Sequence, residues 1–387
     1  MRTFLMFLLL APQLALAQGG SGVKGGDAVA CFDRPVKWVA GSGHAPYEDL
    51  IAGQTLTETG RKHIRSADSR EGYQIEHLGE KSAFWESLRD RFYDDALEAM
   101  IARFDEFPIF SLKLREFNAL LRPYWKGMPS PAGLYDVADS GGGFTLIPEC
   151  GFVQAVQRDR DFFTFDSTVN EFFEHLKPGP KAALMQLHEV MYFHAVNVLG
   201  HKTSAGVERL LIEALGRDHT AESLMNELVG RKFVANQYQI ALFRTRKQLT
   251  DRIESEVAKA IAHFQDLSAR VARGTAPCPD NERNPSGPGR QSPLHHPMSY
   301  RHVGAEWTDV LDGYFPGGDY AQPFPQILVK PTNELRQAVT DVNQKSWFTY
   351  EILDRSRQNC RYAGKPMTQE QLDRIVRAKE ELLTFFR

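Results

Sequence analysis

The sequence has few cysteines and tryptophans, and it has no surplus of positive charge. Of its 387 residues, 4 are cysteine and 5 are tryptophan. No two cysteines form a C-x-x-C pair, which excludes the common zinc-finger and dithiol redox motifs. The formal net charge of −3 provides no basic surface for nucleic acid or for an anionic membrane. We therefore expect no nucleic-acid partner.

Long apolar runs are missing after the first residues of the chain. The sequence begins MRTFLMFLLLAPQLALAQ, with one basic residue, an apolar run and an Ala15-Leu16-Ala17 cleavage pattern. We interpret residues 1–17 as a secretory signal peptide that is cleaved after Ala17. No later run approaches the roughly 18 apolar residues of a membrane span. We therefore expect no transmembrane segment after cleavage, and a periplasmic or extracellular location.

The motifs of several common enzyme classes are also missing. There is no G-x-S-x-G elbow, no P-loop and no G-x-G-x-x-G after a predicted strand. These absences argue against α/β-hydrolases, P-loop nucleotide hydrolases and dinucleotide-dependent dehydrogenases.

The cysteines that are present are widely spaced, at Cys31, Cys150, Cys278 and Cys360. An even number of cysteines in an exported chain favours disulfide bonds. Three pairings are possible. We expect Cys31 with Cys150 and Cys278 with Cys360, because each bond then lies within one of the two regions proposed below. The alternative is that some of the four are free, buried thiols.

Composition along the chain predicts four segments. Residues 1–17 form the signal peptide, and residues 18–273 form a main domain whose first residues, 18–26, are a flexible leader. Residues 274–297 are rich in proline and glycine and are typical of a linker. Residues 298–387 form a helical C-terminal region.

Hydrophobic periodicity predicts an α+β fold that is mainly α, with a small antiparallel sheet packed on a helical core. The predicted strands are 28–32 and 36–40, which form a hairpin, and 144–147, 152–156 and 162–165. Residues 41–72 read mostly as loop. The predicted helices run from Ser82 to just before Pro108 and over 110–121, 180–200, 204–216, 234–272, 333–352 and 368–387.

The helix predicted at 180–200 is apolar over most of its circumference, which indicates a core helix. His188 and Tyr192 lie in its apolar stripe with Glu189 beside them. Buried polar groups are costly unless they are paired, so these residues are the best candidates for a site. His194 and His201 lie on the opposite stripe, and we expect them at the surface.

One hypothesis for this helix is metal-dependent hydrolysis. His188-Glu189-x-x-Tyr192 has the frame of the zinc-binding helix H-E-x-x-H, in which two histidines hold the metal and the glutamate activates water. Tyrosine is a poor replacement for the second histidine. Glu208 and Glu213 follow at spacings where some such enzymes place a third ligand, although glutamate is a common residue.

The other hypothesis is a network without catalysis. His188 could bond to Glu189 or Tyr192, or to Ser204 or Arg209 of the next helix, and so fix how the helices dock. The same residues could also line a pocket that binds a ligand without turning it over. We favour a non-catalytic periplasmic or secreted binding or envelope protein with no cofactor. A zinc-dependent hydrolase is the alternative, and the identity of any metal is unknown from the sequence.

Three short motifs resemble uncharacterised secreted proteins of Bdellovibrio-type bacteria. They are Gly25-Gly26-Asp27-x-Val29-x-Cys31 after the signal peptide, Pro148-x-Cys150 before an alternating strand, and Leu187-His188-Glu189-x-x-Tyr192 followed by Ser204 and Arg209. Phe193 departs from this pattern, in which a basic residue follows the tyrosine. The resemblance implies an exported bacterial protein and no particular reaction.

Overall fold

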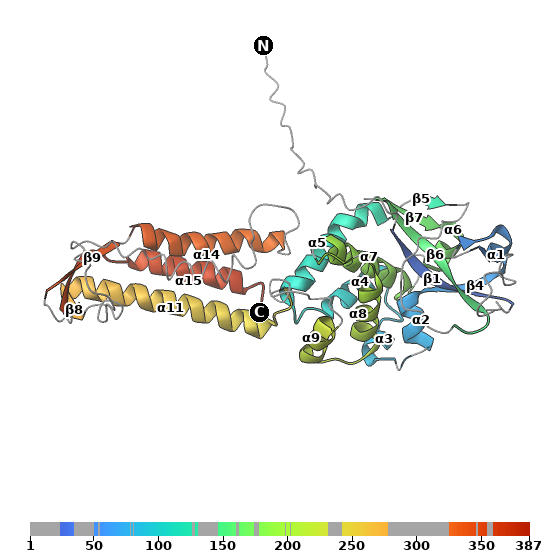
Figure 1. Cartoon of the computed structure of the whole chain (residues 1–387), viewed down its shortest axis with the longest axis horizontal. Helices are drawn as coiled ribbons and strands as arrows, with labels where there is room; N and C mark the ends of the chain where they lie inside the picture. The colour runs from blue at the N-terminus through green and yellow to red at the C-terminus, as the bar shows by residue number, and fades with distance from the viewer. Residues whose placement is uncertain are drawn as a thin grey trace, which may run out of the picture. The chain divides into compact units, whose positions relative to one another are not determined.

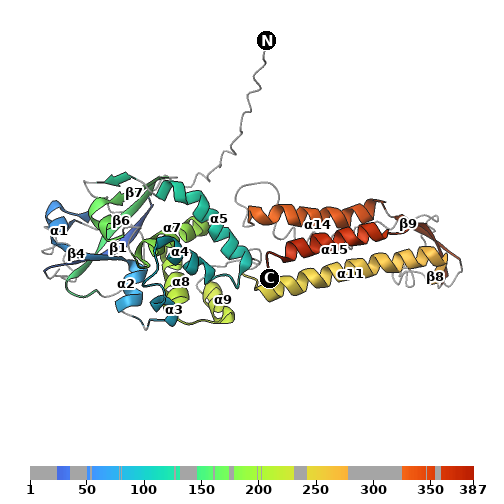
Figure 2. The ribbon, with the colours of Figure 1, turned by 180° about the vertical axis from the view of Figure 1, so that it is seen from behind.

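The structure is a computed structural model of the whole chain (Figures 1 and 2). It describes residues 24–34, 50–52, 55–77, 79, 81–125, 128–130, 146–159, 162–173, 178–197, 199–201, 203–230, 242–277, 325–345, 347–353 and 359–387. The predicted signal peptide at 1–17 lies outside these residues.

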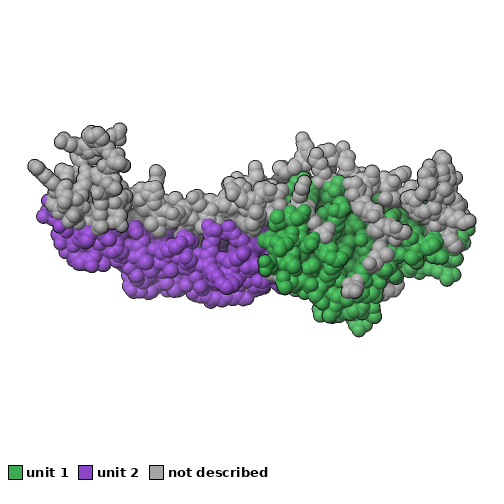
Figure 3. Space-filling model, turned by 60° about the horizontal axis from the view of Figure 1, so that its bottom comes forward, with its two compact units in different colours: residues 1–104, 114–235, 318–322 green, residues 105–113, 236–317, 323–387 purple. Residues whose placement is uncertain are grey.

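The chain divides into two compact units, which Figure 3 colours separately. Unit 1 comprises residues 1–104, 114–235 and 318–322, and unit 2 comprises residues 105–113, 236–317 and 323–387. This division differs from the expected main domain at 18–273, because the chain from residue 236 onward groups with the C-terminal region. Of the predicted linker at 274–297, only residues 274–277 are described.

Unit 1 contains a five-stranded sheet with the strand order β4-β1-β6-β7-β5. Neighbouring strands are antiparallel except β5 and β7, which are parallel. A separate two-stranded ladder joins β2 and β3. The strands are β1 (Lys24–Phe32), β2 (Ile51–Ala52), β3 (Thr55–Leu56), β4 (Ile64–Ser69), β5 (Met128–Ser130), β6 (Cys150–Asp159) and β7 (Phe162–Asp166).

Several strand predictions need correction. β1 begins at Lys24, inside the expected flexible leader, because pairing with β6 satisfies a glycine-rich backbone that has no apolar pattern of its own. The other described neighbour of β1 is β4, which lies in the expected loop at 41–72. The predicted strand at 36–40 lies outside the described residues. Residues 146 and 147 are not in a strand.

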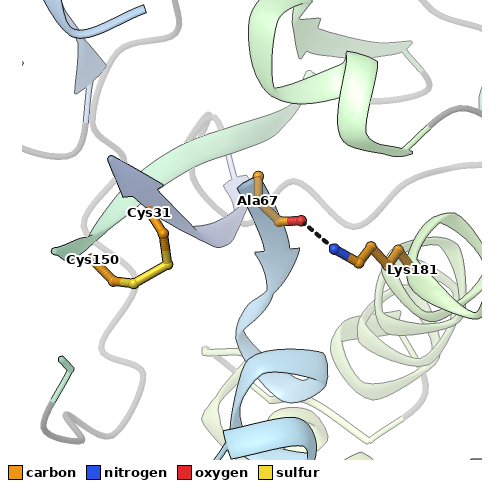
Figure 4. Close-up of a disulfide and its surroundings, with 4 residues drawn as sticks. All are labelled: Cys31, Ala67, Cys150 and Lys181. Carbon is orange, nitrogen blue, oxygen red and sulfur yellow. Dashed lines mark hydrogen bonds between the residues drawn. A yellow bond between two sulfur atoms is a disulfide. The ribbon is translucent and has the colours of Figure 1, made fainter. Parts of the chain in front are cut away.

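A disulfide joins β1 to β6, as predicted. Cys31 and Cys150 are direct partners in the ladder, and their sulfur atoms are bonded (Figure 4). On the neighbouring strand β4, the carbonyl oxygen of Ala67 accepts a hydrogen bond of 2.8 Å from Lys181 Nζ at the start of helix α7 (Figure 4). The disulfide thus links two central strands of the sheet, and the Lys181 hydrogen bond links its edge strand β4 to α7.

The helices of unit 1 group beside the sheet, with α4, α7 and α8 together in both views (Figures 1 and 2). They are α1 (Glu58–His63), α2 (Arg70–His77), α3 (Ala83–Glu86), α4 (Tyr93–Ala102), α5 (Pro108–Trp125), α6 (Ser167–Asn170), the 3₁₀ turn η1 (Glu171–Phe173), α7 (Lys181–Asn197), α8 (Ala205–Gly216) and α9 (Ala221–Gly230). Helix α5 contributes its residues from Leu114 onward to unit 1.

The predicted helix from Ser82 to Pro108 is divided into α3 and α4. Ser82 Oγ caps α3 by accepting from the Trp85 amide at 3.0 Å, and the chain leaves the helix before Tyr93. Pro108 begins α5 rather than only ending the helix before it, as its fixed φ and missing N–H allow at a first helical position. α5 continues through Pro123, past its predicted end.

In its described residues, unit 2 contains the start of α5, three further helices and a three-stranded antiparallel sheet of order β8-β10-β9. The elements are α11 (Arg246–Arg273), β8 (Thr275–Pro277), α14 (Gln326–Lys345), β9 (Trp347–Ile352), β10 (Asn359–Lys365) and α15 (Gln369–Leu383). The last helix was predicted. The region 347–352, predicted as helix, is a strand that pairs with β10.

Helix α11 begins later than the apolar pattern predicted. Thr245 and Gln248 form a capping box that fixes its first turn, and the predicted helical residues 234–241 lie outside the described chain. The helix ends at Gly274, whose φ of 73° favours glycine. Cys360 on β10 is disulfide-bonded. Its expected partner Cys278 lies outside the described residues, so this pairing stays a prediction.

The fold class is α+β and mainly α, as the sequence predicted. Within the described residues, no helix combines the length and the apolar character that crossing a membrane requires.

Candidate functional site

A small cavity with a polar lining lies beside α7 in unit 1, and we call it the α7 cavity. Its lining comes from β1, from the junction of β4 with α2, from α7 and from the start of α8. The lining residues are Gly26, Asp27, Ser69, Arg70, Glu71, Met185, His188, Glu189, Ser204 and Glu208. All of the charged and hydroxyl side chains among them belong to buried residues. Four segments far apart in the sequence therefore bring ionisable groups to one buried place.

The α2 junction positions two of these groups. Ser69 is the last residue of β4, and its Oγ accepts a hydrogen bond of 3.0 Å from the Gly72 amide. This contact turns the strand directly into α2. Arg70 and Glu71 therefore occupy the first turn of that helix, where both are buried.

A β-bulge positions Asp27. The regular pairing of β1 with β6 is interrupted between Gly26 and Asp27, where the register shifts. The buried Gln154 side chain supports the shift, since its Nε2 donates to the carbonyl oxygens of Gly26 at 3.0 Å and Val156 at 2.7 Å. Asp27 then faces Arg70, with Arg70 Nη1 3.1 Å from Asp27 Oδ2.

Glu71 and His188 form a close pair across α2 and α7. His188 Nδ1 lies 2.5 Å from Glu71 Oε1, and the side chains keep only 11% and 3% of their accessible surface. Burial by itself would raise the pKa of Glu71. The charge of His188, its hydrogen bond and the charge of Arg70 outweigh burial and hold the pKa of Glu71 below its usual value. Glu71 therefore stays ionised and orients the imidazole.

The pKa of Glu208 is displaced in the opposite direction from that of Glu71. Burial, followed by the negative charge of Glu71, raises the pKa of Glu208 to about 7. Arg70 Nε at 3.7 Å and a hydrogen bond of 2.7 Å from Gln74 Nε2 offset part of this effect. The α7 cavity thus contains one carboxyl that is firmly ionised and one that exchanges its proton near neutral pH.

Gly26 permits the closest approach of β1 to α7. A Cβ atom at this position would lie 3.0 Å from Glu189 Oε1, closer than nearly all real contacts of a Cβ. Glu189 is itself only 1% exposed. The glycine therefore makes room for a buried glutamate in the wall of the cavity.

The sequence-predicted residues are only partly brought together. His188, Glu189 and Ser204 line the cavity, but Tyr192 does not, although it is buried and its ring centre lies 6.2 Å from that of His188. Arg209 is exposed, and its neighbour Glu208 reaches the cavity instead. The helix α8 turns the position after Glu208 by about 100° away from the cavity.

The expectation that His194 lies at the surface was wrong. His194 is fully buried, with its ring centre 5.6 Å from that of Phe117 on α5. Gln186, on the same stripe, is also fully buried and hydrogen-bonds to Asn118. α7 is therefore covered on both sides, because α5 packs on the stripe that was expected to face water. His201 is partly exposed.

The ionisable side chains around His188 pair with one another. Among the described residues, no group of three or more His, Cys, Asp or Glu side chains is placed to hold a metal ion. Asp27 and Glu208 are engaged by Arg70, and Glu71 by His188 Nδ1. The chemistry of these partners favours an internal network of charges over metal coordination.

The missing members of the cluster were visible in the sequence only as isolated charges. Arg70 and Glu71 stood in a predicted loop, and Asp27 stood next to a predicted leader. The one usable signal was that Glu208 follows Ser204 by four residues, which places both on one face of a helix.

Comparison with known proteins gives no relative: no family model, no curated protein and no solved structure matches the chain.

Proposed function

We propose that this chain is an exported protein that binds a small polar ligand at the α7 cavity. The observation that carries the proposal is the convergence of Asp27, Arg70, Glu71, His188 and Glu208 on one buried cavity. Buried charges cost several kcal/mol each unless they are well paired, and apolar side chains of similar size would often stabilise the fold equally well. Groups that are kept at such a cost, with pKa values displaced in opposite directions, are typical of functional sites.

Export is supported by two features. The first residues have the pattern of a secretory signal peptide. The Cys31–Cys150 disulfide is a bond that persists in oxidising compartments.

The size of the cavity limits what can enter. The volume open to the centre of a water molecule is about 10 Å³, which is room for about one water. A ligand would therefore place one small polar group in the cavity, and its remainder would lie outside. The His188 side chain keeps 11% of its accessible surface, so it is not fully closed off from solvent.

A thermal-shift screen with a matched pair of variants tests this proposal. The mature protein is screened against neutral amides, esters, sugars and amines, beside Glu208→Gln and Glu213→Gln. Both glutamates are buried on α8, but only Glu208 lines the cavity. We expect at least one class to raise the melting temperature of wild type and Glu213→Gln, and to lose its effect in Glu208→Gln.

The opposite result would leave a structural network. If no class shifts the wild-type protein, or if the shift survives in Glu208→Gln, the cavity is not the binding site.

A further inference from the structure

We propose that the α7 cavity is also a hydrolytic site, in which Ser204 is the nucleophile, His188 the general base and Glu71 the residue that orients His188. The substrate class is an ester of a neutral or cationic carboxylic acid. This inference rests on the proposed function, since the cavity must admit a ligand. It goes beyond that function by adding covalent turnover without a metal.

The Glu71–His188 pair has the arrangement that such a base requires. A carboxylate that accepts from Nδ1 keeps the proton on that nitrogen and leaves Nε2 as the basic atom of the imidazole. Glu71 and His188 come from different helices, α2 and α7, and both are buried, so the ring cannot turn freely. The contact of 2.5 Å therefore fixes the orientation of the ring, and when the ring is neutral it favours the proton on Nδ1.

Ser204 lies in the wall of the cavity that His188 also lines. It is the N-cap residue of α8, and it is only 4% exposed. Ser204 and His188 line the same cavity, and that cavity has room for about one water-sized group. A reacting group that enters the cavity would therefore lie near both side chains.

The start of α8 provides donors for a developing negative charge. The first amides of a helix have no acceptor within the helix. In α8 the carbonyl of Ser204 accepts from Val207 at 2.8 Å and from Glu208 at 3.0 Å. Ala205 and Gly206 precede them and carry little or no side chain. Their N–H groups are the candidates for an oxyanion hole beside the serine.

The reaction balances with water as the only other reactant. Ser204 Oγ attacks the carbonyl carbon of the ester while its proton passes to His188 Nε2. The tetrahedral intermediate then collapses, the bond to the alcohol oxygen breaks, and the alcohol leaves with that proton. Water attacks the acyl-serine in the same way, with His188 again taking and returning the proton. The products are the alcohol, the carboxylic acid and the free enzyme.

The charges around the cavity set the specificity. Asp27, Glu71, Glu189 and Glu208 supply four carboxyl groups, against the guanidinium of Arg70 and the imidazole of His188. An acyl group with its own carboxylate would be repelled there, and a neutral or cationic one would not. The carboxylate product would be repelled as well, which favours its release.

Labelling by an alkyl fluorophosphonate tests the nucleophile directly. The mature protein is treated with the reagent, and the adduct is counted by intact mass and located by peptide mapping. We expect one adduct per chain, on Ser204. Ser204→Ala, which removes one oxygen atom, should lose the adduct and keep the circular dichroism spectrum of the wild type. Hydrolysis of p-nitrophenyl acetate should fall by about 100-fold or more in the same variant.

Ser223 is the matched control. Its Oγ lies 3.2 Å from His219 Nδ1, and Glu213 Oε2 lies 3.8 Å from His219 Nε2, but this group does not line the α7 cavity. Ser223→Ala should label as wild type does. An adduct on Ser223, or no adduct on the folded wild-type protein, would overturn the inference. A ligand-induced thermal shift that persists without any adduct would leave the binding function standing.

The orienting role of Glu71 has its own readout. Glu71→Gln keeps the size of the side chain but removes its charge, and should slow labelling by about 10-fold or more. Glu71→Asp keeps the charge and should recover part of the rate. Equal rates in the two variants would show that Glu71 only supports the fold.

Discussion

The interiors of the two units differ in how their buried charged residues are arranged. In unit 2, every buried residue of α11 and α15 is apolar, and the many charges of both helices lie on exposed or partly exposed positions. In unit 1, α7 and α8 bury His188, Glu189 and Glu208 among their apolar residues, and α2 buries Arg70 and Glu71. Hydrophobic burial forms both interiors. Elsewhere in the described part of unit 2 the buried charges are separate residues, Lys113 and Asp341, and Asp341 pairs with Arg374. The charges of unit 1 instead gather around one cavity, which packing alone does not explain.

The largest effect should come from removing the cation at the centre of the α7 cavity. Arg70→Ala leaves Asp27 and Glu208 buried without their ion-pair partner, and should destabilise unit 1 by about 3–5 kcal/mol. In unit 2, Lys259→Ala breaks an exposed pair with Glu256 and should cost less than about 1 kcal/mol. Urea denaturation measures both. Equal losses would mean that the two interiors do not differ in the way described.

Removal of the disulfide should come next. Cys31 and Cys150 close a loop with a sequence separation of 119, and replacing both by serine should cost about 2–4 kcal/mol. Hydrogen exchange resolved by peptide should show the loss in β1 and β6. Loss of protection in α11 and α15 to the same degree would show that the two units unfold together.

Glu208→Gln should change stability in a way that depends on pH. The pKa of Glu208 is raised from 4.5 to about 7 in the folded protein, so the folded state holds a proton that the unfolded state releases between these values. Stability contributed by this group is therefore present at low pH and lost as pH rises toward 7. The glutamine variant should be more stable than wild type by roughly 2–3 kcal/mol at pH 8 and nearly equal to it at pH 4.

Subtracting the unfolding free energy of wild type from that of the variant isolates the contribution of Glu208. The lowered pKa of Glu71 has the opposite effect on the pH dependence of stability, but it is present in both proteins. Glu213→Gln is the control on the same helix. A constant difference between wild type and Glu208→Gln from pH 4 to pH 8 would contradict the assignment.

The smallest effect should be at a helix cap of unit 2. Thr368 accepts from the Gln371 amide at 3.3 Å and forms a capping box with that residue. Thr368→Ala should destabilise the protein by about 1 kcal/mol, and Thr368→Ser should be nearly neutral because it keeps the hydroxyl. An equal loss in both variants would assign the effect to the methyl group instead.

Sequence periodicity predicted what depends on local pattern. α7, α8 and α15 were predicted close to their observed bounds, as was the pairing of Cys31 with Cys150. β4 was missed because its sequence, IRSADS, is polar and its burial does not alternate. The stretch at 347–352 was predicted as helix, because a segment of six residues that is only rich in apolar side chains does not distinguish a helix from a strand.

The sequence predicted only some of the polar residues that line the candidate site. His188, Glu189 and Ser204 were found because a polar residue in an apolar helical pattern is conspicuous. Asp27, Arg70 and Glu71 were not, because each becomes buried only through contacts between β1, α2 and α7. Charged residues in such surroundings look like ordinary surface residues until the tertiary fold is known.

The position of β1 constrains when unit 1 can fold. β1 lies between β4 and β6, and its partner Cys150 follows Cys31 by 119 residues. Until β6 leaves the ribosome or a translocation channel, one edge of β1 has no partner strand, and such edges promote aggregation. The pairing of β1 with β6 joins residues far apart in the sequence, so closure of the sheet is slow compared with formation of the helices. Until the sheet closes, the free edge of β1 can pair with a strand of another chain.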